Sequence, residues 1–379
     1  MSKVDFYRHH LGGEELEALR GVLGSLFLTT GPRTAEFERA FAGYLGAPFA
    51  VGVTSCTSAL ILSLKALGIG PGDEVITTPM TFIATSTAIL HTGAEPVFVN
   101  VEPDTGNLDA TRLREALTER TRAVLPVHLY GQMADMRRVR EFADENGLLV
   151  VEDAAHAVEA SRDGVRPAEL SDAACFSFYA VKNLTSGEGG AVATRRAELD
   201  EKLRSLRLHG MTRGAYDRYS ASYQHWDMTE LGYKANMSDL QAALLLCQIP
   251  RIEERLARRE ELARSYDAAL RGIDGVERPV IREGARSARH LYTIWVAPER
   301  RDEVLTRLQE AGVGVAVNFR AIHLLSYFRE RFGFERGMFP NAERIGDRTI
   351  SLPFYVGMAE ADVARVAERL AKIIESPSS

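Results

Sequence analysis

Leu148-Leu-Val-Val-Glu-Asp153-Ala-Ala-His156 is an apolar run that ends in a carboxylate and a histidine. It follows a helix predicted over residues 136–146, which Gly147 closes. An unbroken apolar strand directly after a helix is typical of a parallel sheet covered on both faces. Asp153 therefore falls at the carboxyl end of a buried strand, the edge at which open α/β sheets bind their ligands.

A second strand end lies in Phe176-Ser177-Phe-Tyr179-Ala-Val-Lys182, after a strand predicted over residues 174–178. Lys182 stands among mainly uncharged residues and precedes the glycine-rich turn Gly187-Glu-Gly-Gly190. A lysine in such surroundings can be partly desolvated, which lowers its pKa and frees the amine to form a Schiff base. The same pattern also fits a surface lysine at the end of a strand.

Outward from these segments, the chain up to about residue 200 alternates short β-rich runs with helical stretches. The expected strands are 74–78, 96–101, 123–127, 148–151 and 174–178, and the expected helices are 58–67, 109–117 and 136–146. This alternation predicts an α/β fold with a mainly parallel sheet between helices.

After about residue 240 the pattern changes. Pro250 is expected to kink or interrupt the helical structure just before a charged helix. The elements expected here are a helix over 251–272, a strand over 291–296, a helix over 301–311, a strand over 314–319 and a terminal helix over 361–375. The sequence therefore predicts a large α/β domain, residues 1–250, and a smaller C-terminal α+β domain, residues 251–379.

The composition excludes several classes of protein. The 379 residues are 45% apolar and 26% charged with a net charge of −6, unlike proteins that neutralise nucleic-acid phosphates. Three cysteines without C-x-x-C spacing argue against a disulfide scaffold, a zinc site and an iron–sulfur centre. The uncharged run 75–94 carries many Ser and Thr residues, which favours a buried strand, turn and helix over a membrane span. The charged amino terminus lacks the apolar core of a signal peptide, so we expect a cytoplasmic protein. From the charge, the cysteines and the run 75–94 together, we expect no metal, nucleic acid or membrane partner.

Two further segments complete a set of groups with a common chemistry. Gly52-Val-Thr-Ser-Cys-Thr57-Ser58 opens a helix with hydroxyl residues, so free N–H groups and the helix dipole form a cup for an anion, although ordinary N-capping explains the same residues. Phe82 follows the strand at 74–78 and offers an aromatic face, unless it packs in the core. An anion cup, an aromatic ring, the Asp153 carboxylate and the Lys182 amine are the four parts needed to hold pyridoxal 5′-phosphate (PLP).

These segments resemble the DegT/DnrJ family of nucleotide-sugar aminotransferases, which are fold-type-I PLP-dependent transferases, and the resemblance covers essentially the whole chain. The pairing of Asp153-Ala-Ala-His156 with Phe176-Ser-Phe-x-x-x-Lys182-Asn is highly specific for that family. Further matching segments are Leu28-Thr-Thr-Gly31, 54–60, Gly72-Asp-Glu-Val, Pro126-Val-His128-Leu-Tyr130-Gly131, Gly232-Tyr-Lys-Ala-Asn236 and Ser351-Leu-Pro.

The resemblance implies a role for each matching residue. Lys182 corresponds to the Schiff-base lysine and Asp153 to the partner of the pyridine nitrogen, and these two are the expected catalytic residues. The other expected cofactor-binding residues are Thr57, Ser58 and Ser177 at the phosphate, Phe82 as the stacking aromatic, His156 beside the cofactor, and Asn236 reaching the phosphate from a neighbouring subunit. The resemblance therefore also implies a homodimer with shared active sites.

The resemblance implies the substrates as well: an amino acid, expected to be L-glutamate, donates its amino group to a nucleotide-linked keto-sugar. Two segments resemble those of enzymes that aminate C4 of UDP-linked 4-keto-sugars, namely Gly232-Tyr-Lys-x-Asn236 and Asn318-Phe-Arg320-Ala-Ile-His323. Such enzymes serve polysaccharide or lipopolysaccharide biosynthesis and include the UDP-4-amino-4-deoxy-L-arabinose branch. Candidate substrate contacts are Tyr179, Arg213, Arg218, Arg320 and His323. Tyr179 and Asn318 stand where relatives often have His, which bears on the choice of sugar.

Two other functions fit the same scaffold. A sugar dehydratase of this family would replace the lysine by histidine or add a cysteine-ligated cluster, whereas Lys182 is present and the cysteines are few. A PLP-binding regulatory protein without turnover is expected to carry a DNA-binding domain or a basic stripe, and the sequence shows neither. An aminotransferase is therefore the expected function.

Overall fold

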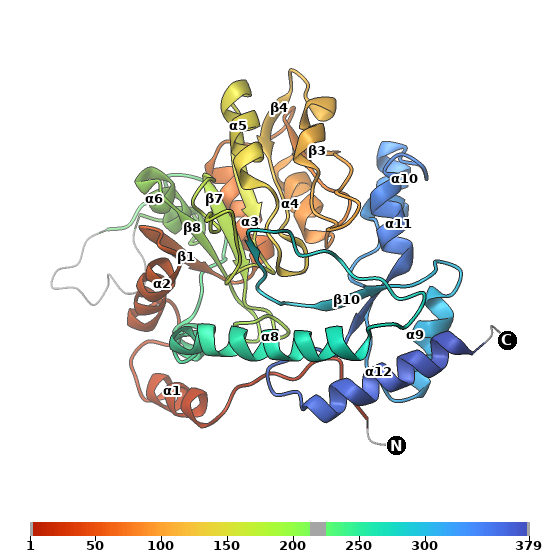
Figure 1. Cartoon of the computed structure of the whole chain (residues 1–379). Coiled ribbons are helices and arrows are strands. Elements are labelled where there is room, and N and C mark those ends of the chain that lie inside the picture. The colour runs from red at the N-terminus through yellow and green to blue at the C-terminus, as the bar shows by residue number, and fades with distance from the viewer. Residues whose placement is uncertain (1–2, 213–224, 377–379) are drawn as a thin grey trace.

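A seven-stranded sheet forms the centre of the larger part of the molecule in the computed structural model, which describes residues 3–212 and 225–376 (Figure 1). Its strands are β1 (Phe49–Val53), β2 (Glu74–Thr77), β3 (Glu95–Phe98), β4 (Thr121–Val124), β5 (Leu149–Asp153), β7 (Ala173–Ser177) and β8 (Gly190–Thr194). In the order β1-β8-β7-β5-β4-β2-β3, β8 runs antiparallel to both neighbours and the other pairs run parallel. The predicted mainly parallel α/β sheet is thereby confirmed.

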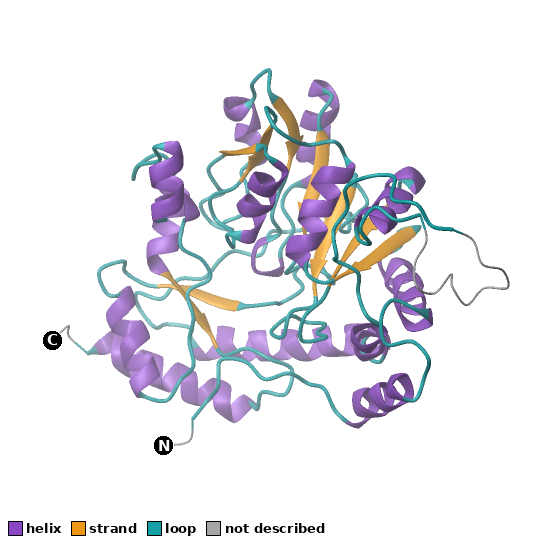
Figure 2. Ribbon diagram, turned by 180° about the vertical axis from the view of Figure 1, so that it is seen from behind, coloured by secondary structure: helices purple, strands orange, loops and turns teal. Residues whose placement is uncertain are grey.

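Helices cover both faces of this sheet (Figure 2), because successive strand residues point to opposite sides. In β7, Ala174 and Phe176 belong to one apolar cluster, whereas Ala173 and Cys175 belong to another. The first cluster includes side chains of α2 (Pro32–Leu45), α5 (Met136–Asn146) and α7 (Asp239–Leu246), and the second includes those of α3 (Cys56–Ala66), α4 (Ala84–Thr92) and α6 (Ala197–Leu206). Burial on both sides explains why the strands read as continuous apolar runs.

A smaller α+β part is built on the antiparallel pair β10 (Tyr292–Trp295) and β11 (Thr349–Leu352). Its apolar cluster includes side chains of α8 (Ile252–Ala269), α9 (Arg301–Glu310) and α12 (Glu360–Glu375). Val4 joins this cluster and pairs with Val313, so the two ends of the sequence pack together. The remaining elements are α1 (Gly13–Leu23), α10 (Ser326–Phe332), α11 (Pro340–Arg348), the short strands β6 (Ser161–Arg162) and β9 (Ala285–Arg286), and the 3₁₀ helices η1 (Ala110–Ala116), η2 (Leu129–Gly131), η4 (Ile249–Arg251) and η5 (Ile322–Leu324).

The two parts of the molecule are packed directly against each other. Met80, at the end of the sheet, shares an apolar cluster with Trp295 of β10. The N–H of Ala288 also donates to the carbonyl of Gly131 (2.8 Å). These contacts bring the segment before β10 to the edge where the parallel strands end. The domain boundary at residue 250 stays a prediction.

Three local predictions concern single segments. The expected helix break at Pro250 is present, since α7 ends before this residue and α8 begins only after η4. The segment 109–117 is helical as expected but forms the 3₁₀ helix η1 instead of an α-helix. The uncharged run 75–94 forms β2, a turn and α4, and across residues 3–212 and 225–376 no helix is long and apolar enough to cross a membrane.

The strand predicted over 314–319 is wrong. Only Ala316 bridges to β11, at Ser351, and no ladder extends from that bridge. The following residues, Asn318 and Phe319, line a cavity instead. Val315 packs against the apolar cluster of the smaller part, so the apolar pattern of this segment reflects tertiary packing, which a sequence pattern alone does not distinguish from a strand.

Candidate active site

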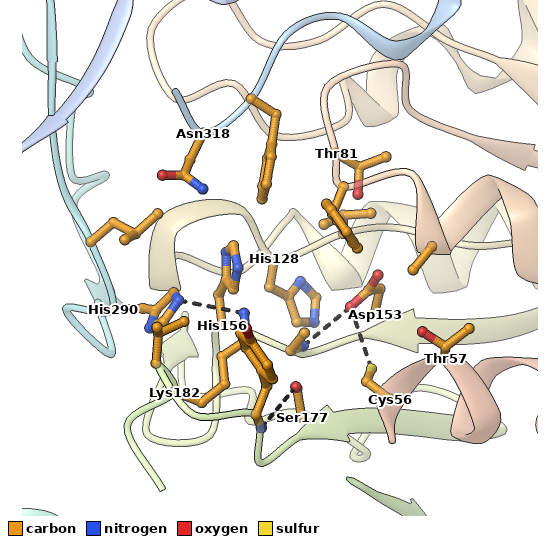
Figure 3. Close-up of a pocket in the computed structure, with 18 of the residues that line it drawn as sticks. Cys56, Thr57, Thr81, His128, Asp153, His156, Ser177, Lys182, His290 and Asn318 are labelled. Atoms are coloured by element: carbon orange, nitrogen blue, oxygen red, sulfur yellow. Dashed lines mark hydrogen bonds between the residues drawn. The ribbon is translucent and has the colours of Figure 1, made fainter. Parts of the chain in front are cut away.

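A cavity of about 480 Å³ opens where β5 and β7 end (Figure 3). Asp153 is the last residue of β5 and Ser177 the last of β7, and both line the cavity. The first turn of α3 and the loops after β2 and β7 form further walls, and residues 290–291 and 318–319 of the smaller part close the remaining side. Because parallel strands end at one edge, residues far apart in the sequence meet here.

Most of the site residues predicted from the sequence line this cavity. They are Thr57, Phe82, Asp153, His156, Ser177, Tyr179 and Lys182. The structure does not bring Ser58, Asn236, Arg320 or His323 to its walls. Arg213 and Arg218 lie outside the described residues.

Two of the predicted substrate residues face elsewhere. Arg320 is exposed to solvent. His323 is completely buried, and its Nε2 lies 3.1 Å from a carboxylate oxygen of Glu343. The imidazole of His323 is therefore committed to a structural contact away from the cavity.

Two of the predicted phosphate-binding residues are also engaged elsewhere. The Ser58 hydroxyl lies 3.0 Å from that of Thr54, behind the first turn of α3. Asn236 lies in a separate open hollow of about 1220 Å³, where its Nδ2 donates to Thr30 Oγ1 (2.6 Å). Within one chain, Asn236 therefore does not contribute to the cavity.

The Asp153 carboxylate is fixed by short polar contacts. Its Oδ2 accepts a hydrogen bond from Thr85 Oγ1 (2.8 Å), and its Oδ1 accepts one from the N–H of Ala155 (3.2 Å). Cys56 Sγ lies 3.9 Å from Oδ1. Since the side chain is only 6% exposed, this carboxylate is a strong electrostatic partner for a cationic group placed in the cavity.

The Lys182 amine is buried in the same cavity. Burial lowers the pKa of Lys182 to about 8, and the negative charge of Asp153 partly opposes that shift. With such a pKa, about a tenth of the amine is uncharged at pH 7, compared with a negligible fraction for an exposed lysine. Lys182 therefore has the nucleophilic form that covalent binding of a carbonyl compound requires.

Two imidazoles stand beside Lys182. The rings of His156 and His290 lie 4.3 Å apart, and the Phe319 ring lies nearly parallel to His156 at 5.9 Å. Burial and the nearby charge of Lys182 lower the pKa of His156 well below its ordinary value. Its buried Nδ1 has no hydrogen-bond partner among the described residues. Such an atom is costly to leave unpaired, and a polar ligand in the cavity would supply the partner.

The first turn of α3 forms the other end of the cavity. Ser55 is its N-cap, since its Oγ accepts from the N–H of Ser58 (3.1 Å). The N–H groups of Cys56 and Thr57 have no acceptor within the described part of the chain. Gly190 of β8 approaches so closely that a Cβ there would lie 2.4 Å from the carbonyl carbon of Ser55. Free N–H groups at a helix start, together with the helix dipole, can hold a phosphate.

Sequence reasoning missed His290 and assigned no role to His128. His290 stands just before β10, as Asp153 stands at the end of β5, but no pattern shows which strand ends meet across two parts of a molecule. His128 is completely buried at the back of the site, and its Nε2 lies 2.6 Å from Glu152. For His128 the available signal was a polar residue inside an otherwise apolar run.

Known proteins are similar to this chain in sequence and in structure. Residues 9–371 match the DegT/DnrJ/EryC1/StrS aminotransferase family. The spore coat polysaccharide biosynthesis protein SpsC of Bacillus subtilis (strain 168) is 44% identical over 371 residues, which cover 96% of this chain and 95% of that protein. The structure of S. venezuelae DesV matches with a TM-score of 0.92 and 36% identity over 100% of both chains.

Another similar structure is that of the putative sugar aminotransferase Spr1654 from Streptococcus pneumoniae. It is solved in a PLP form and a PMP form, and both match with a TM-score of 0.91 and 30% identity over 99% of each chain. These similarities confirm the predicted fold-type-I architecture. Because the family match and these relatives span almost all of the sequence, the chain belongs to the DegT/DnrJ/EryC1/StrS aminotransferase family.

Proposed function

We propose that this protein uses PLP to transfer an amino group from L-glutamate to the keto carbon of a nucleotide-linked keto-sugar. The observation that carries the proposal is that one buried cavity contains the Lys182 amine, the Asp153 carboxylate and the first turn of α3. An amine, a carboxylate and an anion cup are three of the four groups needed to hold PLP, and Phe82 at the cavity wall offers the fourth, an aromatic ring. Membership of an aminotransferase family supports the same chemistry.

The residues present fit this cofactor. The unpaired N–H groups of Cys56 and Thr57 suit a phosphate, and the unpaired Nδ1 of His156 suits a polar ring substituent. The residues that would hold PLP are Thr57 and Ser177 at the phosphate, Phe82 and His156 along the ring, Asp153 at the ring nitrogen and Lys182 at the aldehyde. When bound, the cofactor supplies an electron sink for the negative charge at the carbon that loses its proton.

Two side chains would carry the proton chemistry. Lys182 Nζ takes a proton from the Cα of the amino donor, as a general base whose lowered pKa keeps part of the amine neutral. Asp153, oriented by Thr85 and Ala155, keeps a proton on the ring nitrogen of the cofactor. Asp153 is only 6% exposed and burial lowers the pKa of Lys182, so both interactions act in surroundings of low dielectric constant, which strengthens them.

The sugar substrate is proposed from the relatives and from the rim of the cavity. SpsC is named for polysaccharide biosynthesis, and Spr1654 is described as a putative sugar aminotransferase. Phe82 (56% exposed) and Tyr179 (47% exposed) form a rim that a bulky substrate would meet first. Of the segment 318–323, only Asn318 and Phe319 reach the cavity. We therefore propose that Tyr179 and Asn318 contact the sugar and determine which sugar is bound. The proposed reaction of the protein is amination at C4 of a UDP-linked keto-sugar.

The donor half of the reaction gives the direct test. PLP-loaded protein mixed with L-glutamate alone should lose its yellow colour in a single turnover and release one equivalent of 2-oxoglutarate. Addition of the correct keto-sugar should restore the colour and yield an amino-sugar, and a panel of UDP-, dTDP- and GDP-linked keto-sugars identifies it. A regulatory protein would keep its colour with L-glutamate, and a dehydratase would yield a deoxysugar without a new amino group.

We further propose that two chains share each active site. Large exposed apolar side chains lie in the segments beside Thr30 and Asn236, namely Leu26, Leu28, Trp226, Met228 and Leu231. Large apolar side chains left exposed in one chain favour a surface covered by another subunit, and a two-fold dimer is the commonest assembly. In this arrangement Asn236 of one chain reaches the phosphate cup at Thr57 of the other.

Complementation tests the shared site. In a mixed dimer of a Lys182→Ala chain and an Asn236→Ala chain, one site carries both lesions and the other carries neither. With random exchange of subunits, the mixture should recover about a quarter of the wild-type activity, above either variant alone. Activity that never exceeds the mean of the two separate variants would contradict sharing, as would full activity in a monomer measured by sedimentation.

A further inference from the structure

His290 faces the Lys182 amine, although the proton steps proposed above do not use it. It is 5% exposed and comes from the smaller part of the molecule, just before β10. Its Nε2 lies 3.5 Å from Lys182 Nζ, as the dashed line between these residues shows (Figure 3). The polarity of this contact depends on which ring nitrogen carries the proton.

The neighbour Asn183 decides that question. Its Nδ2 donates one hydrogen bond to Glu159 Oε2 (3.0 Å) and another to the carbonyl of Ala288 (2.9 Å). Both amide hydrogens are thereby used, so Oδ1 is the atom that faces His290 Nδ1 at 3.2 Å. An amide oxygen only accepts, and Nδ1 must therefore carry the proton. The lone pair of Nε2 then points toward Lys182.

A buried ion pair holds this arrangement in place. Glu159 accepts a hydrogen bond from Arg259 Nη2 of α8, and both side chains are almost completely buried. Arg259 Nε also donates to the carbonyl of Ala288 (3.3 Å), the same carbonyl that orients Asn183. Four linked groups therefore fix the tautomer of His290, because the other tautomer would place the Nδ1 lone pair against the accepting oxygen of Asn183 and the N–H of Nε2 against the Lys182 ammonium.

Burial and the basic groups around His290 keep its ring neutral. Lys182 approaches from the loop after β7, His156 from the segment after β5, and Arg259 from α8. Burial first, and then these three basic groups, lower the pKa of His290 well below its ordinary value. A proton shared between the two residues therefore stays on Lys182 across the neutral range.

We propose that His290 is a positioning residue for Lys182. The Nε2 atom of His290 accepts a hydrogen bond from the protonated amine of Lys182 and holds that amine at the end of the cavity. Its role in amino transfer rests on the proposed function, in which Lys182 carries the proton taken from the donor. An acceptor that binds the ammonium without taking its proton stabilises the protonated state of Lys182 and fixes its direction.

Two variants that differ by one methylene test the contact. Asn in place of His290 can still donate to Asn183, but it is too short to present an acceptor where Nε2 stands. Gln reaches that position, and its amide can donate to Asn183 while its oxygen faces Lys182. Tyr7→Phe is the matched control, because the Tyr7 hydroxyl donates to the main-chain carbonyl of Lys182 (3.2 Å) and leaves the amine alone.

The measured quantity is the pKa of Lys182 in the full chain freed of cofactor. It is obtained from the pH dependence of acylation of Lys182, followed by peptide mass spectrometry, since only the neutral amine reacts. The wild-type midpoint should lie at about 8. His290→Asn should move it down by about one unit, the effect of one hydrogen bond to a charged group. His290→Gln should return it to within a few tenths of a unit (~0.3) of wild type, and Tyr7→Phe should leave it in place.

A second measurement uses the PLP-loaded protein. His290→Asn should lower the first-order rate of the donor half-reaction about tenfold with little change in the half-saturating L-glutamate concentration, and His290→Gln should recover most of it. An unchanged midpoint in a folded His290→Asn protein overturns the inference, whatever the activity. If the cofactor binds another lysine, peptide mapping shows it and the proposed function fails, while the midpoints still report whether His290 contacts Lys182.

Discussion

Lys182→Ala should slow the donor half-reaction with L-glutamate by at least about 10³-fold, near the upper end of what one positioned acid–base group contributes. Among the residues that line the described cavity, Lys182 is the one lysine. The imidazoles of His156 and His290 cannot replace it, because burial holds the pKa of each well below its ordinary value and makes both weak bases. Single-turnover loss of the cofactor colour measures the rate.

The same prediction has a covalent readout. Borohydride reduction of the PLP-loaded protein, followed by peptide mapping, should place the pyridoxyl group on Lys182. Lys372→Ala is the matched control, since Lys372 lies on the exposed face of α12 and pairs only with Glu368 in the described contacts. A label on Lys234, or a normal half-reaction in Lys182→Ala, would remove Lys182 from the mechanism.

Much of the larger part could be predicted because its strands are buried on both faces and read as apolar runs between helices. The reversed strand β8 shows what such a pattern leaves out. Residues 178–189, between β7 and β8, contain no helix to carry the chain back across the sheet. A parallel connection needs such a crossover, so the two neighbours can only be antiparallel. The signal for the antiparallel direction of β8 was therefore the absence of a helix from residues 178–189, and not a feature of the strand itself.

The site was predictable as far as it depends on one sheet edge. Asp153 and Lys182 follow adjacent strands, so their meeting follows from the topology of a parallel sheet. His290 and Asn318 reach the cavity from the smaller part, through tertiary packing that leaves no periodic trace in the sequence. Asn236 lies outside the cavity of its own chain, and its role at the phosphate of a neighbouring subunit stays a prediction.

Asp153→Asn should keep the fold and most of the affinity for PLP, yet slow the donor half-reaction by at least about 10²-fold. The amide has the volume of the carboxylate and can still accept a hydrogen bond from Thr85 or Ala155. It cannot hold a full positive charge on the ring nitrogen of the cofactor. A charge-assisted hydrogen bond in a buried site is worth about 1.5–3 kcal/mol, and more when it strengthens toward the transition state.

A pH measurement separates this electrostatic role from a loss of structure. The negative charge of Asp153 raises the pKa of Lys182 against the opposing effect of burial, so a neutral amide should let that pKa fall below about 8. In cofactor-free protein, the midpoint of Lys182 acylation should therefore move to lower pH in Asp153→Asn. Thr85→Val, which removes one donor to the carboxylate but keeps its charge, should leave the midpoint nearly unchanged and slow the half-reaction far less. A near-normal half-reaction in Asp153→Asn, or equal losses in the two variants, would show that the charge of Asp153 is not what the reaction requires.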